Sequence, residues 1–225
     1  MSSHLSIYGV IMIYYSLFFL AVTTGRKNGS VQLKDVLSGK SEPGELFIRL
    51  IAGIFSLGIG TVVIFAKEII DNKIFVPFLN DYQAPVLILT GAAMAIGSFS
   101  AHKELFPADN SRPLLSFSLP LYFLLIRTLY LIVYEFFFRG VMLFVMIKDL
   151  GLIAAVALNL LFYALVHWFN RKERIGSVFM GIILCIVSIY YHGVWPAILI
   201  HFSLALSHEI TLLINNKSLI KKSWL

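Results

Sequence analysis

Long apolar runs alternate with short polar stretches along the whole of this chain of 225 residues. Most runs are close to the roughly 20 apolar residues that a helix needs to cross a bilayer. The pattern predicts an all-α protein, a polytopic transmembrane helical bundle of about seven to eight spans. The predicted spans are residues 5–25, 46–66, 82–101, 113–147, 150–170 and 175–191, and a last one that begins near residue 193.

The run 113–147 is longer than one span requires. As a continuous helix it would be about 52 Å long, whereas the apolar core of a bilayer is about 30 Å thick. Two irregularities are compatible with this length. One is a kink at Pro120, and the other is a hidden break near Arg127 that would add an eighth span.

Small side chains in two of the runs have a structural interpretation. The pairs Gly91/Ala95 and Ala93/Gly97 place small residues four apart in the run 82–101, which predicts close approach of another helix. The single cysteine, Cys185, forms no internal disulfide, and we interpret it as a small buried apolar side chain.

Composition agrees with the membrane assignment, because 59% of the residues are hydrophobic and only 13% are charged. The net charge of +6 indicates basic cytoplasmic loops, since no Lys/Arg run exceeds two residues and no nucleic-acid motif accompanies it. With seven spans and the N-terminus outside, the cytoplasmic loops would hold 12 Lys and Arg and the outer loops three. We expect a multi-pass protein of the cell membrane, the cytoplasmic membrane in a bacterium, that binds no nucleic acid and has the lipid bilayer as a partner.

Charged and imidazole side chains inside the apolar runs are the candidates for chemistry. Glu135 and Arg139 lie four residues apart and share a helix face, with the carboxylate N-terminal to the cation. His167 and His201 lie in two later runs. A charge at membrane depth costs several kcal/mol unless it is paired or hydrated. We therefore expect these side chains to meet in the interior of the bundle.

Three roles are open for this set. Two imidazoles and a carboxylate fit a catalytic zinc ion with one position left for water. They also fit an acid/base pair that activates water. In a purely structural role, each histidine would hydrogen-bond a neighbouring helix while Glu135 paired with Arg139. The predicted span limits place His167 and His201 roughly 15 Å apart in depth, which argues against a shared site.

Three short motifs follow one another on successive predicted helices. They are Tyr134-Glu135-Phe136-Phe137-Phe138-Arg139, Tyr163-Ala164-Leu165-Val166-His167 and His201-Phe202-Ser203-Leu204-Ala205. They resemble the Glu-Glu-x-x-x-Arg, Phe-x-x-x-His and His-x-x-x-Asn motifs of the CPBP family of intramembrane proteases, also called the Abi or CAAX-protease family. The resemblance implies three parts: N-terminal transmembrane helices and loops at 1–112, a CPBP-like catalytic core at 113–216, and a basic cytoplasmic tail at 217–225.

The resemblance also implies a function. Family members include type II CAAX prenyl endopeptidases and bacteriocin self-immunity proteins. The chain is expected to hydrolyse a peptide bond at or in the membrane, in a CAAX-type prenylated or other membrane-associated substrate. Its catalytic residues would be Glu135, Arg139, His167 and His201. Glu135 would serve as base or metal ligand, Arg139 would orient it, and His167 and His201 would bind Zn²⁺ or another divalent metal.

Two positions depart from the family motifs. Tyr134 stands at the first Glu position, and a side chain with a pKa near 10 is a poor base at neutral pH. Glu135 is one residue further on, about 100° around the helix. Ala205 stands at the Asn position and cannot donate to an oxyanion, a loss that typically costs about 10²–10³ in rate. The hydroxyl of Tyr134, the amide of Asn159 or the imidazole of His208 could supply that donor.

These departures keep two alternatives beside the endopeptidase. One is a catalytically impaired relative that acts as a membrane scaffold or as a bacteriocin-immunity-type binding protein. The other is a small transporter, which would show paired broken helices at repeated positions. The sequence contains no repeat, so the transporter is the least favoured of the three.

Overall fold

The computed structural model describes residues 2–23, 32–59, 61–62, 83–104, 118–168 and 171–219 of the chain. Within these ranges the regular structure is helical and contains no strand, which confirms the predicted all-α fold. The α-helices are α1 (Ser2–Thr23), α2 (Leu33–Leu37), α3 (Pro43–Ile54), α6 (Ala84–His102), α7 (Ser118–Glu135), α8 (Leu143–Leu150), α9 (Leu152–Val166), α10 (Arg171–Tyr190) and α11 (Trp195–Asn215).

Several helices have the length and composition of membrane spans. Among the described residues, four candidates are Ala84–His102, Pro120–Leu150, Glu173–Tyr190 and Trp195–Asn215, and two shorter apolar helices are Ile7–Thr23 and Leu152–Val166. The predicted span 46–66 begins in α3, but residue 60 and residues 63–66 lie outside the described residues. Positions 220–225 of the predicted tail also lie outside them. The exact number of spans therefore stays a prediction.

The long run of the sequence is one helical rod. Helices α7 and α8 are joined by the π-helical turn η2 (Phe136–Met142), so the backbone is helical from Ser118 to Leu150. Pro120 lies in the first turn of α7, where its missing N–H costs nothing. Arg127 lies inside α7, so the break considered near this residue is absent. The irregular turn overlaps the Glu135–Arg139 motif instead, and π turns are frequent at functional sites.

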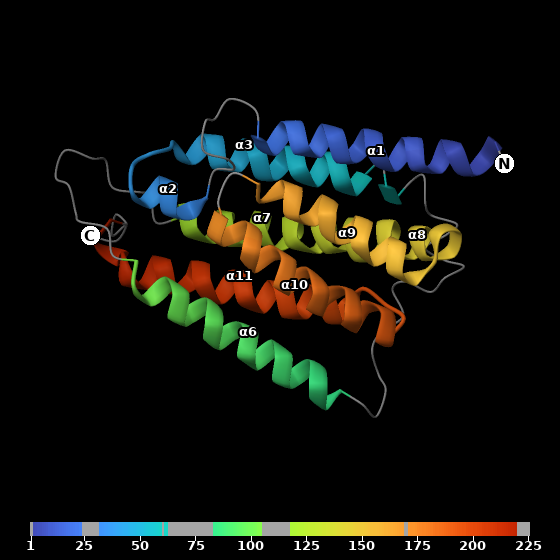
Figure 1. Cartoon of the computed structure of the whole chain (residues 1–225). Helices are drawn as coiled ribbons and strands as arrows, with labels where there is room; N and C mark the ends of the chain where they lie inside the picture. Colours follow the sequence, from blue (N-terminus) through green and yellow to red (C-terminus); the bar gives the residue numbers. More distant parts are fainter. Residues whose placement is uncertain are drawn as a thin grey trace.

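The rod is the centre of the bundle. Helix α3 packs against one side of α7 and α11 against another, while α9 and α10 contact the π turn. Figure 1 shows α1 beside α3 at one edge of the bundle and α6 beside α11 at the opposite edge. A single residue, Gly151, joins α8 to α9 with φ of 80°, a left-handed conformation that favours glycine.

One of the two predicted small-residue pairs lies at a helix contact. Ala93 and Gly97 are buried, and a Cβ added at Gly97 would lie 2.3 Å from the backbone oxygen of Leu204 in α11. Gly91 and Ala95 face outward, and a Cβ at Gly91 would meet no atom of the described residues within 4 Å. The Ala93/Gly97 pair therefore allows the close approach of α6 to α11, and the prediction for Gly91/Ala95 was wrong.

Candidate functional site

The antiparallel packing of α7 and α11 brings Glu135 next to His201. The imidazole Nδ1 of His201 lies 2.5 Å from Oε1 of Glu135. The Glu135 side chain is completely buried, whereas that of His201 is 15% exposed. If the carboxylate accepts this bond, Nδ1 carries the proton and Nε2 is the basic nitrogen of the neutral imidazole. Glu135 therefore lies deeper in the protein than His201.

Arg139 completes the buried side of this pair. Its Nε lies 3.5 Å from Oε2 of Glu135, and its guanidinium stacks over the ring of Tyr163 at 4.0 Å. Gly181 of α10 lies beside the guanidinium, since a Cβ there would be 3.3 Å from Nη2. The Glu135–Arg139 contact expected from their spacing is thus present. It gives a buried carboxylate a cationic neighbour, without which burial would be costly.

Asn159 supports the π turn. Its Nδ2 donates to the backbone oxygen of Phe138 at 2.7 Å, and its Oδ1 accepts from Sγ of Cys185 at 3.4 Å. Both ends of the amide are used, and the side chain is fully buried. Asn159 is therefore not placed to donate to a substrate. Cys185 is buried, as the sequence suggested.

Tyr134, the residue that departs from the family motif, lies in the wall of a cavity next to His201. The centroids of the two rings are 5.9 Å apart. The residue is only 3% exposed, and among the described residues no group hydrogen-bonds to its hydroxyl. Glu135 does not line the cavity. The rotation expected between positions 134 and 135 thus puts Tyr134, and not Glu135, at the cavity.

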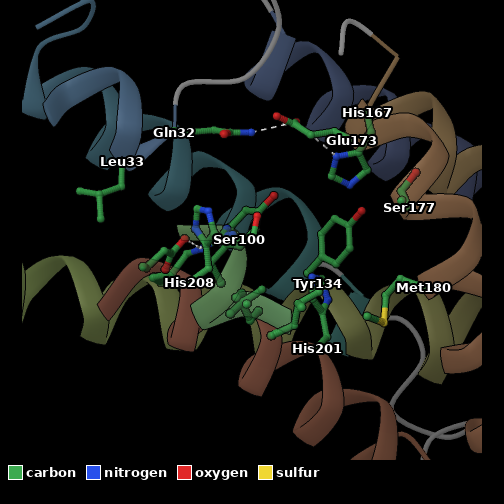
Figure 2. Close-up of a pocket in the computed structure, with 18 of the residues that line it drawn as sticks. Gln32, Leu33, Ser100, Tyr134, His167, Glu173, Ser177, Met180, His201 and His208 are labelled. Carbon is green, nitrogen blue, oxygen red and sulfur yellow. Dashed lines mark hydrogen bonds and ion pairs between the residues drawn. The ribbon is translucent and has the colours of Figure 1, made fainter. Parts of the chain in front are cut away.

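His167 lies in the same cavity but has a different acidic neighbour. Its Nδ1 is 3.9 Å from Oε2 of Glu173 in α10. Glu173 also accepts hydrogen bonds from Gln32 at 2.8 Å and from Lys34 at 3.2 Å, so it ties α2 to α10. In Figure 2, Gln32, Glu173 and His167 group on one side of the cavity, and Tyr134 and His201 lie on the other.

The two histidines nevertheless line one cavity. The ring of Tyr163 contacts both, with centroid distances of 5.7 Å to His167 and 6.4 Å to His201. The predicted depth difference of roughly 15 Å was therefore too large. His167 ends α9, and His201 lies inside α11, so the packing of two inclined helices brings the rings to one cavity.

The donor set predicted for a metal ion does not come together in this arrangement. Within the described ranges, no three His, Cys, Asp or Glu side chains are grouped so that they could hold a metal. His201 and Glu135 are adjacent, but His167 is paired with Glu173 on the other side of Tyr163. Zn²⁺ at His167, His201 and Glu135 stays a prediction, and the chemistry proposed below uses protein groups alone.

The cavity has a volume of about 720 Å³ and is lined mostly by apolar side chains from α1, α2, α3, α6, α7, α9, α10 and α11. It also contains an ion pair that was not predicted from the sequence. Nε of Arg127 in α7 lies 2.9 Å from Oε1 of Glu209 in α11. The sequence contained a signal for this pair, because Arg127 precedes Glu135 by eight residues and Glu209 follows His201 by eight. In two antiparallel helices, equal offsets in opposite directions bring such residues to the same level.

Comparison with known proteins finds a family model that matches the segment holding this site. Residues 116–207 match the family model described as type II CAAX prenyl endopeptidase Rce1-like. The matched segment contains Glu135, Arg139, His167 and His201. No curated protein and no solved structure matches the chain. Residues 116–207 of this helical membrane protein are therefore similar to the CAAX-protease-like family.

Proposed function

We propose that the chain is an intramembrane endopeptidase of the cell membrane, with His201 as the general base. The observation that carries this proposal is the His201–Glu135 pair. An imidazole lies at the wall of a cavity, its Nδ1 is held by a fully buried carboxylate, and both residues belong to the segment that matches a peptidase family. A base oriented by a second group is the usual arrangement for activating a nucleophile.

In the proposed reaction, Nε2 of His201 takes a proton from a water molecule as the water oxygen bonds to the carbonyl carbon of the substrate. The tetrahedral intermediate then expels the amine, and the imidazolium returns the proton to the leaving nitrogen. Glu135 keeps Nδ1–H oriented and stabilises the imidazolium, as the buried aspartate does in the serine protease triad. This assigns to His201 the basic role that the family resemblance gave to the glutamate.

Tyr134 is the proposed donor to the oxyanion. Its hydroxyl is buried in the cavity wall beside His201, and among the described residues it has no hydrogen-bond partner. A buried donor that gains its acceptor only when charge develops on the carbonyl oxygen favours the transition state. The hydroxyl would thus replace the amide that Ala205 lacks.

The proposed substrate is a membrane-associated peptide or protein, including one of the CAAX-type prenylated class named by the matching family. The mostly apolar cavity wall supports a substrate with an apolar attachment. The departures at Tyr134 and Ala205 favour a second candidate, a membrane protein that binds such a substrate without cleaving it.

The test is hydrolysis of prenylated and unprenylated peptides by the purified full-length protein in detergent, followed by mass spectrometry. The proposal expects a discrete cleavage that H201A abolishes while the melting temperature stays near that of the wild type. Binding without cleavage by the wild type would favour the binding protein. Cleavage that persists in H201A would remove His201 from the mechanism.

A further inference from the structure

A second polar pair lies in the cavity and takes no part in the hydrolysis proposed above. Arg127 donates from Nε to Oε1 of Glu209, and both side chains line the cavity. The pair joins the same two helices as Glu135 and His201. It is displaced by eight residues on each helix, which corresponds to about 12 Å along the axis at 1.5 Å per residue.

This pair has hydrogen-bonding capacity left over. Glu209 is buried, and among the described residues no group donates to its Oε2. The bond to Oε1 uses one of the five N–H groups of Arg127, whose side chain is 23% exposed. A buried acceptor without a donor costs free energy. A pair that only joined α7 to α11 would be expected to satisfy both carboxylate oxygens.

The donor and the acceptor of this pair indicate which kind of ligand it can bind. Since the two charges compensate each other, the pair offers an N–H donor and a carboxylate acceptor without net charge. A peptide group matches both, because its C=O accepts from Arg127 and its N–H donates to Glu209. A charged ligand would lose its hydration in a mostly apolar cavity without meeting an opposite net charge here.

We propose that Arg127 and Glu209 form a subsite that binds a main-chain peptide group of the substrate. An extended chain spans about 3.3–3.6 Å per residue, so a separation of about 12 Å places that group three to four residues from the scissile bond. The position relative to the scissile bond rests on the proposed function, since it takes His201 as the catalytic end. The subsite would fix the register of the substrate and its minimum length.

The experiment measures binding in the H201A background, so that the readout does not need hydrolysis. The probe is a fluorescein-labelled peptide with S-farnesyl cysteine at its centre and four residues on each side, which is long enough to reach the subsite in either direction. A matched set carries one N-methyl group at the third or fourth peptide nitrogen on either side. Methylation at one of these positions should weaken binding about tenfold or more, because Glu209 loses its donor.

E209Q supplies the critical comparison. Glutamine keeps the shape of Glu209 and can still accept from Arg127 through Oε1, but its NH₂ group replaces the acceptor Oε2. H201A/E209Q should bind the unmethylated peptide about tenfold more weakly than H201A, and should bind the methylated and unmethylated peptides alike. E45Q is the matched control. Glu45 pairs with Arg49 but does not line the cavity, so H201A/E45Q should keep the discrimination.

The outcomes separate the subsite from the hydrolysis. Discrimination that is the same in H201A and in folded H201A/E209Q would overturn the subsite, as would absence of binding by every peptide. If Glu209-dependent discrimination appears but the wild type cleaves nothing, the subsite stands and the proposed hydrolysis fails. If the wild type cleaves the peptide but E209Q changes neither register nor discrimination, the hydrolysis stands and the subsite fails.

Discussion

His201 and Glu135 meet at 2.5 Å across the antiparallel helices α7 and α11, with the imidazole at the cavity and the carboxylate completely buried behind it. This order of burial decides which of the two can reach a substrate. A water molecule in the cavity can contact the imidazole, whereas the carboxylate acts on that water only through the ring. The positions of the two groups therefore predict different consequences for their removal.

H201A should abolish hydrolysis, and E135Q should lower kcat by about 10²–10⁴ with a smaller effect on KM, because the amide no longer orients and stabilises the imidazolium. Steady-state kinetics on a cleaved peptide measures both. E135Q also leaves Arg139 without its carboxylate, so we expect unfolding at lower temperature. An E135Q enzyme with wild-type kcat would show that the buried carboxylate takes no part.

Y134F should lower kcat by about 10²–10³ and leave KM nearly unchanged, because the lost hydroxyl binds only the developing oxyanion. The fold should be retained, since the hydroxyl has no hydrogen-bond partner among the described residues. A205N provides a sharper test in the Y134F background. Ala205 also lines the cavity, and an amide at this position should recover part of the lost kcat. An unchanged kcat in Y134F would exclude the hydroxyl as the donor.

H167A should lower kcat/KM by no more than about tenfold, because the imidazole is paired with Glu173 on the other side of Tyr163. Metal analysis of the wild type, H167A and H201A by mass spectrometry accompanies the kinetics. Near-stoichiometric zinc that both variants lose, together with equal losses of activity, would contradict this prediction. That result would show that His167 leaves Glu173 to complete the metal site predicted from the sequence.

N159A should destabilise the protein by about 1–3 kcal/mol, because the buried backbone oxygen of Phe138 loses its donor and the amide leaves a small cavity. Chemical denaturation in detergent measures the change. C185A is the control on the other side of the amide, where a weak Sγ donor is lost, and its effect should be smaller. Equal losses of stability in the two variants would contradict a larger contribution from the hydrogen bond to the π turn.

G97A and G91A form a matched pair on helix α6. A methyl group at position 97 would lie 2.3 Å from the backbone oxygen of Leu204, so G97A should destabilise the protein by about 1–3 kcal/mol. G91A meets no atom of the described residues within 4 Å and should be neutral or stabilising by up to about 1 kcal/mol, because alanine favours the helix. Thermal unfolding should rank G97A clearly below G91A. The reverse order would refute the close contact of α6 with α11.

The properties that depend on spacing along one helix could be predicted from the sequence. Hydrophobic runs long enough to span a bilayer predicted the helices, and a spacing of four predicted the contact of Glu135 with Arg139. The single-residue offset between Tyr134 and Glu135 predicted that they face different directions, as the structure shows. Three motifs in order also indicated the family that the comparison confirmed. Each of these inferences depends on local spacing or on residue order.

Which groups meet across helices could not be predicted in this way, because it depends on how the helices pack. The partner of His201 is Glu135, whereas that of His167 is Glu173, and spacing along either helix is compatible with other choices. The pairing of Arg127 with Glu209 likewise depends on the register of α7 against α11. That register and the depth of each side chain follow from how whole helices pack, including the π turn. Helix packing sums many weak contacts between distant segments, so no local pattern contains it.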